Sequence, residues 1–131
     1  MFLLDTNIVS YWMRGDSKVI ARLKERSPSE LGLSAVTLAE ILYGIEKSPV
    51  KKRERWDKIH RIASLLPLYP FGEEAAQKYA AVRCELERDG CAISERDTQI
   101  AAVALAHRLT LVTHNIKEFG RISRLRVEDW A

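Results

Sequence analysis

The 131-residue sequence has few of the residues that bind metals through sulfur or imidazole, with only two cysteines and three histidines. Six residues separate Cys84 from Cys91, and no second cysteine pair or nearby histidine completes a zinc-ligand pattern. The histidines His60, His107 and His114 are not spaced as a catalytic set. The sequence thus argues against a structural zinc site and predicts buried or idle thiols in a reducing compartment.

Long hydrophobic runs are also missing. No apolar segment approaches the roughly 20 residues that a membrane-spanning helix needs, and the N-terminus lacks the basic region and apolar stretch of a signal peptide. With 47% hydrophobic and 30% charged residues, the composition is that of an ordinary globular protein. There are no repeats, linkers or low-complexity segments. We therefore expect a single domain over residues 1–131, located in the cytoplasm and not bound to a membrane.

Positive charge is distributed unevenly along the chain. The formal net charge is only +3, but residues 47–61 contain seven Lys or Arg against two acids. Within this segment, Lys51, Lys52, Arg53 and Arg55 stand close together. Such a patch would attract a polyanion such as RNA or DNA, although a solvated helix face explains the same pattern equally well.

The order of short apolar segments and amphipathic segments predicts an α/β fold. Strands are expected at residues 2–5, 31–34, 68–70, 109–113 and 125–127. Helices are expected at residues 7–13, 17–25, 38–45, 49–66, 73–88, 94–108 and 116–119. Strands that alternate with helices throughout a chain are typical of a short parallel sheet covered by helices on both faces.

Acidic side chains stand where expected strands end or helices begin. Asp5 ends the first strand, while Glu40, Asp97 and Glu118 fall near helix starts. One interpretation is purely structural, because Thr37-x-x-Glu40, Ser94-x-x-Asp97 and Asn115-x-x-Glu118 match a helix-capping box, and Asp5 could cap the first helix. The other is a functional cluster, because ligands bind beyond the carboxyl ends of parallel strands.

Helical spacing favours the functional interpretation for Asp97. Ile100, Ala101 and Ala104 share its helical face, so its carboxylate should point inward, whereas Glu40 heads a mixed face. Inward carboxylates must be paired, protonated or bound to metal. No basic residue stands beside Asp5 or Glu40 in the sequence. Oxygen ligands without His or Cys favour Mg²⁺, with Mn²⁺ as a substitute, and such ions promote phosphodiester hydrolysis.

These residues also form an ordered series of motifs. In chain order they read Leu4-Asp5-Thr6-Asn7, Ser34-x-x-Thr37-x-x-Glu40-x-x-Tyr43-Gly44, Arg96-Asp97-x-x-Ile100-Ala101-Ala102, Leu111-Val112-Thr113-x-Asn115-x-x-Glu118-Phe119 and Glu128-Asp129-Trp130. The series resembles the PIN-domain ribonuclease toxins called VapC over nearly the whole chain. The resemblance implies a PIN fold, Mg²⁺-dependent endoribonuclease activity on an RNA such as a tRNA anticodon loop, a homodimer, and inhibition by a cognate VapB antitoxin.

Roles for individual residues follow from the same resemblance. Asp5, Glu40 and Asp97 match the three acids of the family, with Asp5 and Asp97 as metal ligands and Glu40 orienting or deprotonating the attacking water. Thr6 and Thr113 match hydroxyl positions that support the site.

Two positions need separate comment. Where the family often has a fourth Asp, this chain has Asn115, and Glu118 one turn later can supply the missing acid. Arg96, beside Asp97, either contacts an RNA phosphate or faces solvent.

Two rival functions fit part of the pattern. Phosphatases of the haloacid dehalogenase type also begin with a strand that ends in Asp, but they require a second Asp where this chain has Asn7. A non-catalytic RNA- or protein-binding module would use its acids only as helix caps. Binding of a divalent metal tests this second alternative, because isolated caps would not bind Mn²⁺ together.

Overall fold

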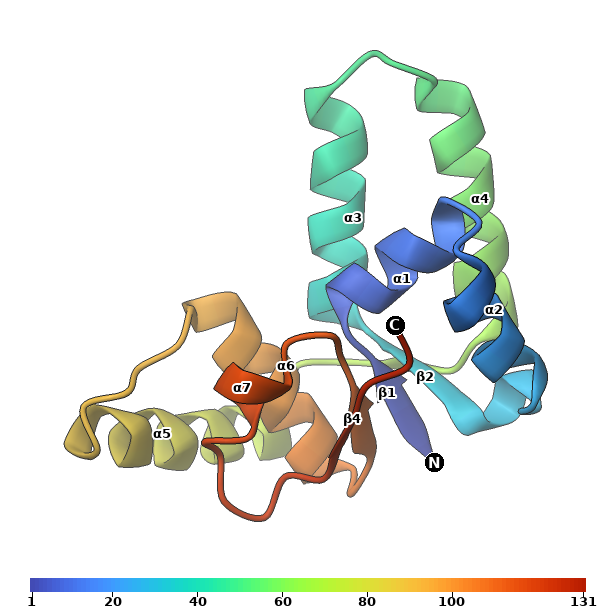
Figure 1. Ribbon diagram of the computed structural model, residues 1–131. Helices are drawn as coiled ribbons and strands as arrows, with labels where there is room; N and C mark the ends of the chain where they lie inside the picture. Colours follow the sequence, from blue (N-terminus) through green and yellow to red (C-terminus); the bar gives the residue numbers. More distant parts are fainter.

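The computed structural model describes all residues from 1 to 131 and places five parallel strands in one sheet. The strands lie in the order β3-β2-β1-β4-β5, with β1 at the centre (Figure 1). Their bounds are Phe2–Leu4 for β1, Leu31–Ser34 for β2, Leu68–Tyr69 for β3, Thr110–Val112 for β4 and Val127–Glu128 for β5. The predicted parallel α/β sheet is therefore confirmed.

Seven helices surround this sheet. They are α1 (Thr6–Met13), α2 (Ser17–Lys24), α3 (Ala35–Lys47), α4 (Lys52–Leu65), α5 (Glu73–Arg88), α6 (Glu95–Ala106) and α7 (Ile116–Phe119), with a short 3₁₀ turn at Pro28–Glu30. Helices α3 and α4 stand side by side as an arm that projects beyond the sheet, and α5 packs against α6 on the other side (Figure 1). None of the helices combines the length and apolarity needed to cross a lipid bilayer.

The sheet separates two hydrophobic clusters. Leu3 and Leu4 follow each other in β1 and point to opposite faces, as successive strand residues must. Leu4 therefore packs into a cluster with α1, α2, α3 and α4, while Leu3 packs into a second cluster with α5 and α6. Because both faces are covered, β1 is an apolar run rather than an alternating one. The next residue, Asp5, is therefore a charged residue that directly follows an apolar strand.

Helix α3 spans Ala35–Lys47 and is longer than the predicted range of 38–45, and two further boundaries are wrong for a reason that the backbone shows. Helix α4 begins at Lys52 rather than at Pro49, because Lys51 adopts a left-handed conformation (φ 49°) that interrupts the helical path. The last strand spans Val127–Glu128 rather than residues 125–127. Here Arg124 has a positive φ of 68°, and the Leu125 N–H donates to the Ile122 carbonyl, so the chain is still turning at Leu125. Both errors arise at left-handed residues other than glycine, for which the sequence carries little signal.

Candidate functional site

The central strands place three polar residues at one edge of the sheet. Leu4 pairs with Leu33 of β2 on one side and with Val112 of β4 on the other. The residues that follow, Asp5, Ser34 and Thr113, therefore emerge together at the carboxyl end of the sheet. This edge is where parallel α/β sheets hold their ligands.

Asp5 lies at the centre of this edge and is only 4% exposed. Its Oδ1 accepts a hydrogen bond from the Thr6 N–H at 2.8 Å, and its Oδ2 accepts one from the Thr113 hydroxyl at 2.8 Å. Asp5 is also the N-cap of α1. The capping interpretation is therefore correct for Asp5, and it does not compete with a functional role, because the same donors hold the carboxylate in a defined orientation.

Burial raises the pKa of the Asp5 carboxyl from 3.8 to about 6. Repulsion from Asp97 and Glu40 adds to this effect, while the hydrogen bonds from Thr113 and Thr6 oppose it. These effects place Asp97 and Glu40 close enough to act on the Asp5 charge.

Glu40 faces the site from the second turn of α3. Its Oε1 accepts a hydrogen bond from the Thr6 hydroxyl at 2.8 Å, and its Oε2 lies 3.5 Å from Arg96 Nη1. The predicted Thr37-x-x-Glu40 capping box is wrong, because the N-cap of α3 is Ser34, whose hydroxyl accepts from the Thr37 N–H. Glu40 is therefore free of a capping role.

Asp97 approaches the same site from the first turn of α6. Ser94 is the N-cap and accepts from the Asp97 N–H at 3.1 Å. Ile100, Ala101 and Ala104 on the same helical face are completely buried, as the spacing predicts. Partial burial raises the pKa of the Asp97 carboxyl above its ordinary value, and repulsion from Glu118 and Glu40 adds to the shift, opposed by a Ser94 hydrogen bond and by the Arg96 charge.

Asn115 and Glu118 differ in their relation to this cluster. Glu118 is near enough to act on the charge of Asp97. Asn115 occupies the N-cap position of α7, but its side chain makes no capping hydrogen bond, and its backbone N–H donates to the Thr113 hydroxyl at 3.0 Å. The predicted Asn115-x-x-Glu118 capping box is therefore wrong. Of the two, Glu118 is the one whose charge acts on the other acids.

The donor set of this site fits a hard divalent cation. The charges of Asp97 and Glu40 act on Asp5, those of Glu118 and Glu40 act on Asp97, and Arg96 pairs with Glu40. No three His, Cys, Asp or Glu side chains lie close enough together to enclose a metal ion by themselves. Mg²⁺ usually takes only one or two carboxylates and completes its octahedron with water or substrate phosphate, so two of these acids would be enough to hold it.

The basic residues predicted to contact RNA have different surroundings. Arg55 donates through Nε to the Val50 carbonyl at 2.9 Å, and its other nitrogens donate to the carbonyls of Gly44, Ile45 and Ser48. Its guanidinium thus binds carbonyls at and just beyond the end of α3, and it also lines the cleft between α1, α3 and α4, so its contact with RNA stays a prediction.

The remaining basic candidates are on the same arm. Lys52 pairs with Glu46 at 3.2 Å, and Arg53 pairs with Asp57 at 3.5 Å. The positive charges of Lys52 and Arg53 are therefore partly neutralised by acids of the same arm. Exposed ion pairs of this kind exchange easily. Lys51 has no ion-pair partner within 4.0 Å and remains the basic candidate best placed for an external anion.

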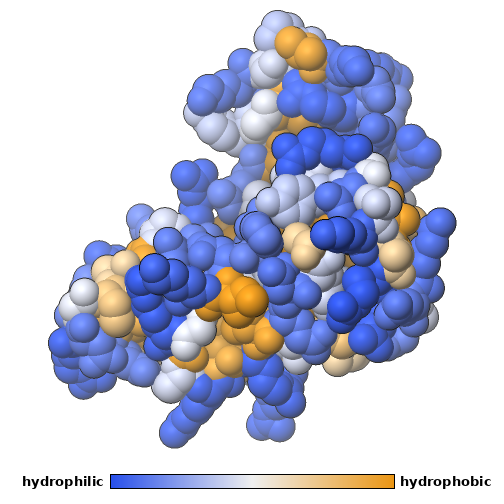
Figure 2. Space-filling view, in the orientation of Figure 1, coloured by the Kyte–Doolittle hydropathy of each residue, from blue (hydrophilic) through white to orange (hydrophobic).

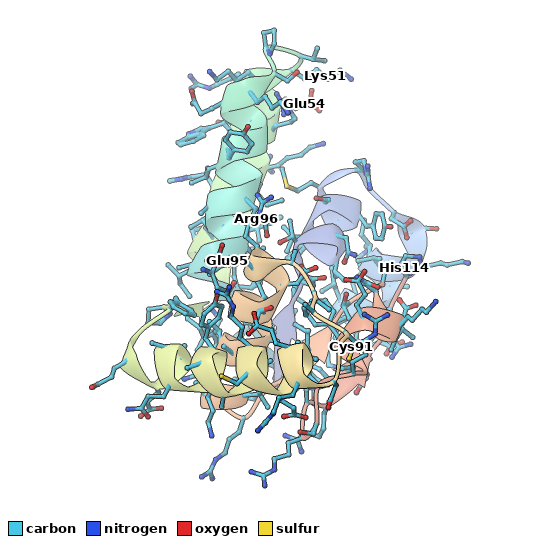
Figure 3. All side chains as sticks on the ribbon, turned by 90° about the vertical axis from the view of Figure 1, so that its left-hand side faces the viewer. Lys51, Glu54, Cys91, Glu95, Arg96 and His114 are labelled. Carbon is cyan, nitrogen blue, oxygen red and sulfur yellow. The ribbon has the colours of Figure 1, made fainter.

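A cleft of ≈ 770 Å³ runs between α1, α3 and α4. Thr6, Glu40 and Arg96 form its inner end, and Lys51, Glu54 and Lys58 line its outer part. Figure 3 shows Lys51 and Glu54 near the tip of the α3–α4 arm and Arg96 near its foot. The arm is covered mainly by hydrophilic residues (Figure 2). The cleft thus connects the carboxylate site with a polar, partly basic surface.

His114 has a partner that the sequence does not reveal. Its Nδ1 lies 3.2 Å from an oxygen of Asp129, and its ring meets Tyr11 edge-on with centroids 6.0 Å apart. It follows Thr113 directly and lies apart from Arg96 in Figure 3. The partner of His114 is thus an acid from the C-terminal segment, and it comes from the fold rather than from sequence spacing.

Comparison with known proteins gives one family and a consistent group of relatives. The PIN domain family matches residues 2–125. Ribonuclease VapC2 of Rickettsia felis is 36% identical over 132 residues, which cover 99% of this chain and 98% of that protein. The tRNA(fMet)-specific endonuclease VapC of Shigella flexneri is 32% identical over 130 residues, covering 99% and 98%.

A solved structure agrees with these relatives. The crystal structure of DNA-bound VapBC from Salmonella typhimurium contains a chain that matches with a TM-score of 0.91 and 31% sequence identity, covering 99% of this chain and 98% of that one. Sequence and fold are therefore similar to these proteins along the full length.

Proposed function

This chain belongs to the VapC family of PIN-domain proteins, and on that premise we propose that it is the toxin of a toxin–antitoxin pair and hydrolyses RNA internally with a divalent cation. The observation that carries the proposal is the grouping of Asp5, Glu40 and Asp97 from three separate elements at the carboxyl edge of the sheet. The names of the relatives support the reaction class. Family membership leaves no support for the phosphatase alternative.

Asp5 and Asp97 are the residues that we propose to hold Mg²⁺ or Mn²⁺. Their pKa values are raised by burial and by repulsion from neighbouring carboxylates, so a bound cation would offset the electrostatic cost of ionising them. When bound, the ion would polarise a phosphoryl oxygen and lower the pKa of a water molecule. Protons compete with the cation for Asp5, so binding should weaken below about pH 6.

The side chains of this site can divide the work of hydrolysis. Thr113 and the Thr6 N–H hold the two oxygens of Asp5, while the Thr6 hydroxyl holds one oxygen of Glu40. We propose that Glu40 accepts a proton from the attacking water as the water oxygen bonds to phosphorus. One bridging phosphorus–oxygen bond then breaks, and the departing oxygen is protonated from solvent.

The relatives also suggest a substrate and partners. The Shigella flexneri protein is named for action on tRNA(fMet), and the Salmonella typhimurium protein was solved as a VapBC complex. We therefore propose a tRNA substrate, cut in a single-stranded loop such as the anticodon loop, where bases and backbone are accessible. We further propose a cognate VapB antitoxin as inhibitor, and a homodimer as the form of the toxin.

The proposal is tested with purified protein and total tRNA. Cleavage is expected with Mg²⁺, and it should stop with EDTA and in Asp97→Asn, because both remove part of the metal site. Fragments are followed on a denaturing gel and their ends mapped. Equal cleavage in all three reactions would indicate a contaminating nuclease and contradict the proposed function.

Glu118 is expected to matter more than Asn115 for metal binding. Glu118→Gln should weaken Mn²⁺ binding on the order of tenfold, because it removes a charge that acts on Asp97. Asn115→Ala should change it by less than about threefold, because the backbone of Asn115 makes the contact with Thr113. Calorimetric titration of the RNA-free protein measures both. Glu95→Gln, an exposed acid in the same turn of α6 as Asp97, is the matched control. A larger loss in Asn115→Ala than in Glu118→Gln would reverse the assignment.

A further inference from the structure

Arg96 is the cation that the fold brings to the carboxylate site. It lies beside Asp97 in the first turn of α6, and its Nη1 is 3.5 Å from Glu40 Oε2. The Arg96 side chain is 62% exposed, whereas the Glu40 side chain is 21% exposed. Arg96 also lines the inner end of the cleft between α1, α3 and α4. A solvent-facing guanidinium thus lies where this cleft meets the acids.

Glu40 has both carboxylate oxygens engaged in this arrangement. The Thr6 hydroxyl donates to Oε1 at 2.8 Å, and Arg96 pairs with Oε2. The Thr6 bond is short and partly buried, so it fixes the orientation of the carboxylate. The pairing with Arg96 is longer and faces solvent. Thr6 fixes Oε1, whereas Oε2 is held only by the longer contact with Arg96, so Oε2 is the oxygen better placed to accept a proton from water.

We propose that Arg96 is a positioning residue that exchanges Glu40 for a phosphate group of the bound RNA and thereby releases Glu40 Oε2 for the attacking water. This inference rests on the proposed ribonuclease function and adds a coupling between substrate binding and the readiness of Glu40. Without RNA, Arg96 neutralises part of the acidic cluster. With RNA, the same charge binds the polyanion.

The chemistry of the two partners favours such an exchange. An ion pair between exposed side chains contributes little to stability, because both groups are well solvated when apart. Guanidinium binds phosphate through two parallel hydrogen bonds, which is a better match than the single contact with Glu40. The cleft of ≈ 770 Å³ leads directly to Arg96, so a phosphate can reach it without rearrangement of the helices.

Arg96→Gln should produce a specific combination of effects. Without RNA, Mn²⁺ should bind about threefold or more tightly, because a competing positive charge is gone. In EDTA, where no cleavage occurs, RNA should bind about tenfold more weakly, because one charged contact is lost. In turnover, KM should rise about tenfold while kcat stays within about threefold, since Glu40 Oε2 is already free. Arg96→Lys should restore most of the RNA affinity.

Arg83→Gln is the matched control, because it breaks an exposed ion pair of similar length, 3.2 Å to Glu87, on helix α5, and Arg83 does not line the cleft between α1, α3 and α4. It should behave as the wild type in all three measurements. An Arg96→Gln protein with wild-type RNA affinity, or with kcat reduced tenfold at unchanged KM, would contradict the proposal. If the wild type shows no metal-dependent cleavage, the ribonuclease function fails, yet the Mn²⁺ and RNA binding measurements still decide the role of Arg96.

Discussion

Asp5→Asn is expected to reduce RNA cleavage at least about a thousandfold and, at the same time, to stabilise the metal-free protein at neutral pH. The loss of activity follows from the removal of a proposed metal ligand at the centre of the site. The gain in stability follows from burial, because the carboxyl is only 4% exposed and its neighbours are acids. Opposite effects of one substitution on activity and stability are typical of a functional site.

The pH dependence of this effect has a definite sign. The pKa of Asp5 is raised from 3.8 to about 6 in the folded protein, so folding favours the protonated form. The contribution of the Asp5 carboxyl to the free energy of unfolding is therefore largest below about pH 4, and it is lost as the pH rises through about 6. Above that pH, the buried charge lowers the free energy of unfolding by about 3 kcal/mol. Asp5→Asn removes this dependence.

Chemical denaturation in EDTA at about pH 4.5 and 7.5 measures the difference. The wild type should lose stability relative to Asp5→Asn between these two values, and added Mg²⁺ should restore it only in the wild type. Asp57→Asn, which removes an exposed carboxylate paired with Arg53, controls for loss of a charge. A metal-free Asp5→Asn protein less stable than the wild type at pH 7.5 would show that the hydrogen bonds from Thr6 and Thr113 outweigh the cost of burial.

Trp130→Ala is expected to lower the free energy of unfolding by about 3–5 kcal/mol. Trp130 is only 2% exposed, although it is the penultimate residue. Its ring lies 5.1 Å from that of Phe2, and the guanidinium groups of Arg22 and Arg26 lie over it. The indole N–H donates to Glu128 at 3.0 Å. The Trp130 side chain is thus part of the hydrophobic cluster that lies between the sheet and helices α1 to α4.

Thermal unfolding should show this loss as a decrease in Tm on the order of 10–20 °C. Trp56→Ala is the matched control, because Trp56 is 42% exposed on α4 and its truncation should cost less than about 1 kcal/mol. Trp130→Phe should fall between the two. If Trp130→Ala and Trp56→Ala have the same Tm, Trp130 contributes little to the stability of the core, which would contradict this prediction.

The sequence by itself determined the elements of the fold and the identity of the acidic residues. Apolar strands, amphipathic helices and turn residues are local patterns, so the α/β order could be read along the chain. The motifs around Asp5, Glu40 and Asp97 indicated the family, and the family match over residues 2–125 confirms it. The catalytic and metal-binding roles of these residues stay predictions.

The tertiary structure decided which side chains meet. The bond from Thr113 to Asp5 joins residues 108 positions apart, and the bond from Thr6 to Glu40 joins residues 34 positions apart. Both depend on β1 lying between β2 and β4, an order that no local pattern encodes. The same holds for Arg55, which supports the end of α3, and for Arg96, which pairs with Glu40. Side-chain pairing depends on packing in three dimensions, and for that reason only the fold separates helix caps, structural cations and site residues.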